Sequence, residues 1–189
     1  AMNPNTDSDI TQLYLNDVGG STWEEINEVT IPVHNNKITD QTRLNYGYRD
    51  REGPCLRGST TDCTPQNKDG YTDPLHWYQH DDDGGGCITG STFVPLEKND
   101  PTTHVKLEWP KLYRTHNDTY FFADYVFRKI YWLAPYDDDL YCRDDCPQQQ
   151  PPSSGYTMTE FHTTGDLGSP LQIRFGPYQQ TLALYYVYV

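Results

Sequence analysis

The residues of this chain best suited to chemistry lie in the segment His76-Trp-Tyr-Gln-His80, which three aspartates at 81–83 follow directly. Two imidazoles and three carboxylates could bind a divalent metal, but histidines four apart converge on one ion only in a helix. Pro74 and the glycines at 84–86 disfavour a regular helix here, and in a strand such histidines lie about 13 Å apart. We therefore expect no metal and no cofactor, and interpret the segment as a polar loop.

Aromatic residues in polar loops are candidates for ligand contacts, because a loop offers no core in which to bury them. Trp and Tyr are enriched among binding hot spots and stack on sugars as well as on proteins. The candidate ligand-binding residues are His76, Trp77, Tyr78, His80, Tyr136 and Tyr141. The neighbouring aspartates at 81–83 and 137–139 favour a neutral or basic partner over a sialylated glycan, since like charges repel.

No catalytic signature accompanies these residues. Glu108 and Glu160 could pair as glycosidase carboxylates, but nothing in the sequence brings them together. The aspartates at 137–139 and 144–145 lack the spacing of a calcium-binding loop, and there is no nucleophile elbow, P-loop or dinucleotide fingerprint. The chain is therefore predicted not to be an enzyme, with a small metal-dependent hydrolase as the least favoured alternative.

Five cysteines leave at least one thiol unpaired within the chain. Cys55 and Cys63 are eight residues apart in one polar loop, and Cys142 and Cys146 are four apart in another. Each pair would close a small loop in an oxidising compartment, and free thiols are the alternative in a reducing one. Neither spacing is typical of a zinc site.

The composition indicates a protein that grips other molecules. Its apolar residues include 16 Tyr, 4 Trp and 6 Phe but only 2 Met, and tyrosine-rich surfaces are common where proteins bind partners. The formal charge of −13 argues against nucleic acid and anionic membranes as partners. No run of residues is long and apolar enough to insert as a membrane span.

The pattern of apolar residues predicts an all-β domain, a β-sandwich or β-barrel with long polar loops and little helix. Alternation of apolar and polar residues marks half-buried strands at 29–33, 44–48, 105–109, 171–175 and 182–189. Only 22–28 has the features of a helix start, and it would be short. We expect the last strand to lie inside a sheet.

The segment 119–133 is apolar on both faces, as in a central strand that is covered on both sides. Its aromatic and β-branched residues are poor helix formers, which favours a strand over a helix. We therefore predict one long central strand. Its buried side chains would be Phe121, Phe122, Tyr125, Val126, Phe127 and Ile130.

At 189 residues the chain fits one domain. Residues 1–9, which begin Ala-Met-Asn-Pro, are expected to be a cloning remnant and a flexible N-terminal segment, and residues 10–189 the domain itself. Long polar loops at 50–74, 79–90 and 134–155 are the places where a rigid β-scaffold carries function.

In overall character the chain resembles the protruding spike domains of small non-enveloped virus capsids, with astrovirus spikes the nearest. The resemblance covers the whole chain: a segment of about this size, little helix, the loops 50–74 and 134–155, and a tyrosine-rich end at Tyr185-Tyr-Val-Tyr-Val189. It implies a sandwich or barrel that dimerises on a larger shell and attaches to a host receptor, so the chain would lie at the virion surface.

Two non-enzymatic functions follow as expectations. The first is a viral capsid spike that binds a host receptor protein or a neutral glycan. The second is a secreted or cell-surface, lectin-like or ligand-binding β-domain. For either, we expect a homodimer, because two-fold pairing is the commonest way to cover exposed aromatic surface.

Overall fold

The computed structural model describes residues 1–3, 9–34, 37–38, 44–63, 70–80, 85–95, 98–99, 106–107, 119–136, 155–179 and 181–189. Over these residues the chain is all-β, as predicted, with antiparallel sheets and one short 3-10 turn at Gly165–Leu167. The sheets do not close into a barrel within this described part.

Three sheets carry the fold. The first contains β1 (Ile10–Asp17), β2 (Trp23–His34), the short β3 (Lys37–Ile38) and β6 (His76–Gln79). The central sheet contains, in spatial order, β12 (Tyr156–Thr163), β11 (Lys129–Pro135), β10 (Tyr120–Asp124) and β7 (Ile88–Phe93). The third is the hairpin of β13 (Pro170–Tyr178) and β14 (Thr181–Tyr188). Two small hairpins join β4 (Arg51–Glu52) to β5 (Cys55–Leu56) and β8 (Lys98–Asn99) to β9 (Lys106–Leu107).

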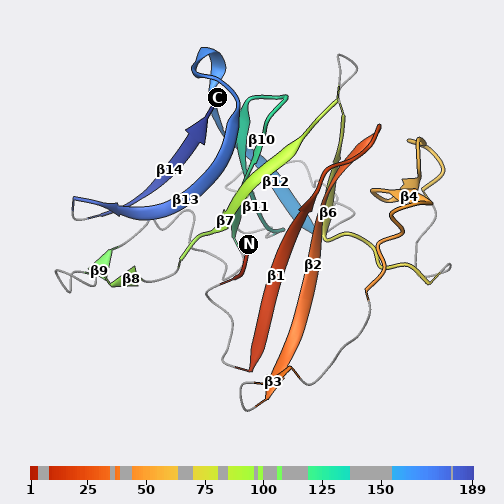
Figure 1. The fold of residues 1–189 in the computed structure, drawn as a ribbon, viewed down its shortest axis with the longest axis horizontal. Coiled ribbons are helices and arrows are strands. Elements are labelled where there is room, and N and C mark those ends of the chain that lie inside the picture. The colour runs from red at the N-terminus through yellow and green to blue at the C-terminus, as the bar shows by residue number, and fades with distance from the viewer. Residues whose placement is uncertain are drawn as a thin grey trace, which may run out of the picture.

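The central sheet is covered on both faces, which explains why its strands are apolar throughout. Figure 1 shows the curved β13–β14 hairpin on one side of the central strands and the long β1–β2 hairpin on the other. Between the β1–β2–β6 sheet and the central sheet, one core contains Tyr14, Ile26, Tyr78, Ile88, Phe93, Tyr120, Phe122, Tyr131 and Leu133. Between the central sheet and the β13–β14 hairpin, a second core contains Val94, Phe121, Ala123, Ile130, Trp132, Ala134, Ile173 and Leu182.

The prediction of one long strand over 119–133 is wrong, because the segment folds back as the β10–β11 hairpin. The Asp124 carboxylate accepts a hydrogen bond from the Phe127 backbone N–H at 2.8 Å and closes the turn, and Arg128 takes a positive φ of 55°. Phe121, Phe122 and Ile130 are buried as predicted, but Tyr125 and Val126 are exposed at the tip and Phe127 is half-buried. The covering on both faces is confirmed for each of the two strands.

Other predictions of local structure have mixed outcomes. The strands expected at 29–33, 171–175 and 182–189 are present in β2, β13 and β14. The helix expected at 22–28 is instead the start of β2. The strand expected at 44–48 is not formed: residues 44–47 have no regular structure, Gly47 has a φ of +79°, and a turn follows at 48–50. Within 105–109, the described strand is limited to β9.

The chain ends also differ from expectation. Residues 1–3 lie along β1 rather than free of it: Met2 forms a bridge with Leu13, and Asn3 is buried. Among the described residues β14 pairs with β13 over Thr181–Tyr188, so the last strand is in a sheet, as predicted, but at the edge of a two-stranded one and not inside a larger sheet.

Candidate functional site

The segment predicted as a binding loop is strand β6, which pairs with β2 so that His76 is opposite Ile26 and Gln79 is opposite Trp23. His76 and Tyr78 are buried, so the prediction that they are surface contacts is wrong. The aromatic residues here do have a core to pack in, because alternate side chains of a half-buried strand face inward. Trp77, on the opposite face of β6, is half-buried.

Tyr78 and His80 belong to a buried carboxylate network centred on Glu24 and Asp124, both fully buried. The His80 ring nitrogen lies 2.6 Å from one Glu24 oxygen, and the other Glu24 oxygen accepts the Ile88 backbone N–H at 2.8 Å. The Tyr78 hydroxyl donates to Asp124 at 2.6 Å. Because Glu24 and Tyr78 come from the first sheet and Ile88 and Asp124 from the central sheet, this network joins the two sheets.

Burial controls the ionisation of these groups. Desolvation raises the pKa of Glu24, although the Ile88 N–H and His80 oppose it. Desolvation and then the Asp124 charge raise the pKa of Tyr78, so its hydroxyl stays protonated and donates. Desolvation lowers the pKa of His76 to about 4, which keeps that ring neutral at pH 7.

The free Cys87 lies beside this network without the chemistry of a nucleophile. Its backbone N–H donates to Asp124 at 3.1 Å. Desolvation, then the charges of Glu24 and Asp124, raise the pKa of the thiol, whereas a nucleophilic cysteine needs a lowered one. Space is also tight, since a Cβ on Gly86 would lie 3.0 Å from the Glu24 side chain and 3.2 Å from the His80 ring. We therefore interpret the network as a structural contact that holds the two sheets together.

The remaining predicted site residues are spread over the chain. Tyr136 is half-buried, and its backbone N–H donates to Gly155. Cys55 and Cys63 form a disulfide, which is one of the two alternatives that the spacing left open. Tyr141, Cys142 and Cys146 lie outside the described residues, as do the aspartates at 81–83 and 137–139.

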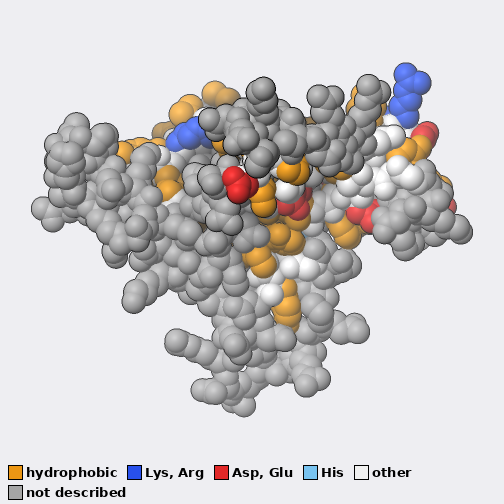
Figure 2. Space-filling model, turned by 90° about the horizontal axis from the view of Figure 1, so that it is seen from below, with side chains coloured by type: hydrophobic (Ala, Val, Ile, Leu, Met, Phe, Trp, Pro, Cys, Tyr) orange, Lys and Arg blue, Asp and Glu red, His pale blue; other side chains and the backbone are white. Residues whose placement is uncertain are grey.

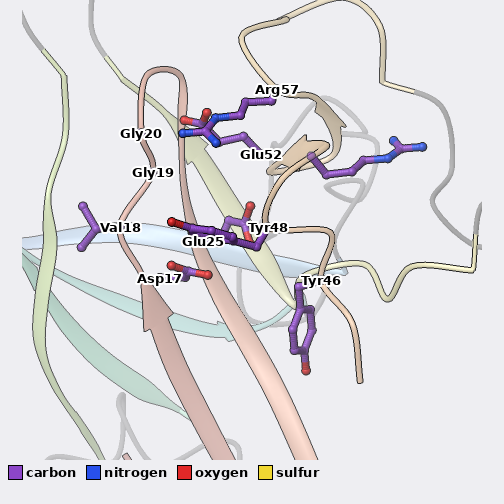
Figure 3. A pocket seen from close by; sticks show the side chains of 10 residues that line it. Asp17, Val18, Gly19, Gly20, Glu25, Tyr46, Tyr48, Glu52 and Arg57 are labelled. Carbon is purple, nitrogen blue, oxygen red and sulfur yellow. The ribbon is translucent and has the colours of Figure 1, made fainter. Parts of the chain in front are cut away.

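A second group of acidic side chains, which the sequence analysis missed, lines a small pocket at the turn between β1 and β2. Figure 3 shows Asp17 and Glu25 there, below Gly19 and Gly20, with Glu52 higher up and nearer to Arg57. This acidic pocket has a volume of about 40 Å³ and is lined by Asp17, Val18, Gly19, Gly20, Glu25, Tyr46, Tyr48, Arg51, Glu52 and Arg57. One wall is the β1–β2 hairpin and the other is the segment 44–63, which contains the Cys55–Cys63 disulfide.

The two buried carboxylates of the acidic pocket bind backbone N–H groups on opposite walls. Glu52 accepts hydrogen bonds from the backbone of Ser21 at 2.8 Å, Thr22 at 2.5 Å and Trp23 at 3.0 Å. Glu25 accepts one from the backbone N–H of Gly53. Gly53 has a φ of +59°, and a Cβ there would lie 2.7 Å from the Trp23 ring, so this position requires glycine.

Their environments push the two pKa values apart. Desolvation raises the pKa of Glu25 to about 7, and the charges of Asp17 and Glu52 add to the effect. Desolvation acts in the same direction on Glu52, but its hydrogen bonds from Trp23, Ser21 and Thr22 outweigh it and leave the pKa lowered. A protonated and an ionised carboxyl in one pocket is the arrangement of an acid–base pair. Here, however, the pocket volume of about 40 Å³ is far below the range of small-ligand pockets, which favours a structural role for the pair over a substrate site.

Exposed tyrosines also lie on the β13–β14 hairpin. Tyr178 is 55 % exposed and Tyr185 47 %, and the pairing of the two strands puts both on one face of the hairpin. We call these two residues the tyrosine ribbon. The Tyr185 ring lies over Gly176, where a Cβ would come within 3.1 Å of it, and its hydroxyl donates to the Pro177 carbonyl at 2.7 Å. The ring is therefore held in place although it faces solvent.

On the face of β14 opposite to Tyr185, an apolar groove of about 410 Å³ runs between β14 and β12. A hydrogen bond of 3.3 Å between the Tyr186 hydroxyl and His162 provides its polar end. Its volume is in the range of small-ligand pockets. Its lining residues are Ile130, Phe161, His162, Leu182, Ala183, Leu184 and Tyr186.

In the part of the chain that the structure describes, no three His, Cys, Asp or Glu side chains are grouped so as to hold a metal ion. The same part contains no helix long and apolar enough to cross a membrane. No protein-family model, curated protein or solved structure matches this chain.

Proposed function

We propose that this chain is a non-enzymatic recognition module, exposed at the surface of a virion, which binds a host receptor through the tyrosine ribbon. The observation that carries the proposal is the fixed, solvent-facing ring of Tyr185. Exposed aromatic side chains that are already ordered lose little conformational entropy on binding, and this is why tyrosine dominates recognition surfaces. The half-buried Trp77 and Tyr136 stay as further candidate contacts.

The charge of the chain defines the kind of partner. The formal charge is −13, and in the view of Figure 2 acidic side chains lie among the hydrophobic ones. A strongly acidic partner would be repelled. The proposed partner is therefore a neutral or basic protein surface or a neutral glycan, whose sugar faces stack on tyrosine rings.

Binding to cells, and to arrays of glycans and host proteins, tests this proposal. We expect the double variant Tyr178→Ala with Tyr185→Ala to bind at least about tenfold more weakly than the wild type, since aromatic hot spots typically contribute more than 1 kcal/mol each. Tyr48→Ala is the matched control, because Tyr48 is 78 % exposed but lies at the acidic pocket. Equal binding by the folded double variant would remove the tyrosine ribbon from the recognition site.

The homodimer that the sequence predicts is also a proposal, and we place its contact at the edge of β14. The strand reads TLALYYVY and so has no charge, proline or glycine, which are the usual protections of an edge strand. Light scattering over a concentration series should give twice the 21.8 kDa chain mass, and Val187→Lys should shift the protein toward monomer. Leu171→Lys, at an exposed site on β13, is the control. A wild type that stays monomeric at high concentration contradicts the proposal.

The disulfide favours a second candidate function, a secreted or cell-surface ligand-binding domain. A disulfide such as Cys55–Cys63 persists in oxidising compartments, whereas a capsid assembled in the cytosol would hold these cysteines as thiols. Both functions use the same tyrosine ribbon, so they differ in where the module is displayed and not in how it binds.

A further inference from the structure

We infer that the acidic pocket is a proton-controlled latch, which holds the segment 44–63 closed on the β1–β2 hairpin in mildly acidic solution and loosens it above neutral pH. This inference does not depend on the partner or on the tyrosine ribbon. It concerns the turn between β1 and β2, where the segment 44–63, which contains the Cys55–Cys63 disulfide, packs on the buried carboxyl group of Glu25.

The contacts that close the latch are reciprocal. Glu52 from segment 44–63 accepts hydrogen bonds from three consecutive N–H groups of the hairpin, and Glu25 from the hairpin accepts the N–H of Gly53 in the segment. The Trp23 indole adds a hydrogen bond of 3.0 Å to the Ser59 carbonyl. A carboxylate of segment 44–63 thus satisfies backbone donors of the hairpin, and a carboxylate of the hairpin satisfies a backbone donor of the segment. The closed arrangement of these two parts buries Gly53 and Glu25.

The group that can change state is Glu25. In the β1–β2 pairing its partner is Asp17, and in the β2–β6 pairing its partner is Trp77, so an acidic residue lies on one side and an uncharged one on the other. On its own strand Asn27 donates to it at 3.3 Å. The remaining titratable and charged groups of the pocket come from segment 44–63 and are Tyr46, Tyr48, Arg51, Glu52 and Arg57.

The groups around Glu25 favour its protonated form over its ionised form. The Asn27 side-chain oxygen is buried and has no hydrogen-bond partner among the described residues. Rotation of the Asn27 amide by half a turn would let that oxygen accept the proton of a neutral Glu25, while Gly53 continues to donate to the other Glu25 oxygen. Ionisation removes this proton and places three carboxylates, Asp17, Glu25 and Glu52, around one small pocket.

The direction of the pH dependence follows from the raised pKa. The folded protein holds the Glu25 proton up to a pKa of about 7, whereas the ordinary value is 4.5, so the closed state binds more protons than the open state between these values. The contribution of Glu25 to closure is therefore fully present below about pH 4.5 and is lost as the pH rises through 7. Glu52, with its lowered pKa, is ionised throughout this window, so its own titration does not contribute to the change.

Hydrogen–deuterium exchange tests the latch, with rates corrected for the intrinsic effect of pH. In the wild type we expect the amides of Ser21, Thr22, Trp23 and Gly53 to lose at least about tenfold in protection between pH 5.5 and pH 8, because one pKa unit corresponds to a tenfold change. Glu25→Gln, which cannot ionise, should keep its protection at both values. Glu160→Gln is the control, since Glu160 is an exposed acid on β12 that bonds to Lys129.

Asp17→Asn provides an independent variant, because Asp17 is exposed and its replacement should leave the fold intact. Removal of its charge lowers the pKa of Glu25, so the loss of protection should move to lower pH and become smaller. The latch is refuted if wild-type protection at these four amides is the same at both pH values. It is equally refuted if Glu25→Gln loses protection as the wild type does.

Discussion

Replacement of Phe121 by alanine should lower the free energy of unfolding by about 3–5 kcal/mol, the usual cost of removing a fully buried aromatic side chain. Phe121 has no exposed surface and packs in the second core, with ring centroids 5.0 Å from Phe161 and 5.7 Å from Phe175 in edge-to-face geometry. Phe161 comes from β12 of the same sheet and Phe175 from β13 of the facing hairpin, so the alanine variant loses contacts both within the central sheet and across that core. Chemical denaturation of the two proteins measures the difference.

Phe127→Ala is the matched control, because it removes the same side chain from the half-buried turn of the same hairpin. Phe127 contacts the first core only at its margin, with a ring centroid 6.2 Å from Tyr78. We expect a loss well below that of Phe121→Ala. Equal losses for the two variants would contradict the hairpin and would restore the single long strand.

The sequence predicted the strands well where one face alone is buried. In β2, β13 and β14 the alternation of apolar and polar residues matches the alternation of side chains across a pleat. It failed at 125–128, because that turn contains no glycine or proline and continues the apolar run. The signal was Asp124, the single acidic residue within the run, whose carboxylate closes the turn.

The acidic sites were not predictable in the same way, because their partners are far away in the sequence. Glu24 and Glu25 look like solvent-exposed residues at a helix start, yet one binds the backbone of Ile88 and the other that of Gly53. The two acidic residues themselves give no sign of burial. The available signal was their apolar neighbours Trp23 and Ile26, since two acids between them in a strand must face opposite sides of the sheet.

The same reasoning explains why the aromatic residues near His76 were misinterpreted. A tyrosine has an apolar ring and a polar hydroxyl group. The sequence alone therefore does not distinguish a tyrosine that contacts a ligand from a loop from one that is buried in a core with a hydrogen-bond partner. The structure provides that partner in Asp124, which lies 46 positions further along the chain. The contribution of the Tyr78–Asp124 hydrogen bond to the free energy of unfolding therefore measures how much this contact helps to hold the two sheets together.

Asp124→Ala should lower the free energy of unfolding by about 3–5 kcal/mol, because it leaves several buried donors unpaired at about 1–3 kcal/mol each. The donors are the Tyr78 hydroxyl and the backbone N–H groups of Cys87 and Phe127. Two of the three are main-chain N–H groups, which stay in place and unpaired when the Asp124 carboxylate is removed. The loss should therefore exceed that of any exposed acid, and Asp166→Ala, at an exposed site in the 3-10 turn, is the control.

A double-mutant cycle with Tyr78→Phe separates the joint between the sheets from the turn of the hairpin. Tyr78→Phe alone should cost about 1.5–3 kcal/mol, as expected for a hydrogen bond to a charged group. In the Asp124→Ala background the same change should cost much less, because the hydroxyl has already lost its acceptor. Additive losses would mean that the 2.6 Å contact between Tyr78 and Asp124 contributes nothing to stability. Asp124 would then act through its bonds to the Cys87 and Phe127 N–H groups, and the two sheets would be held together by their apolar core and the Glu24–Ile88 hydrogen bond.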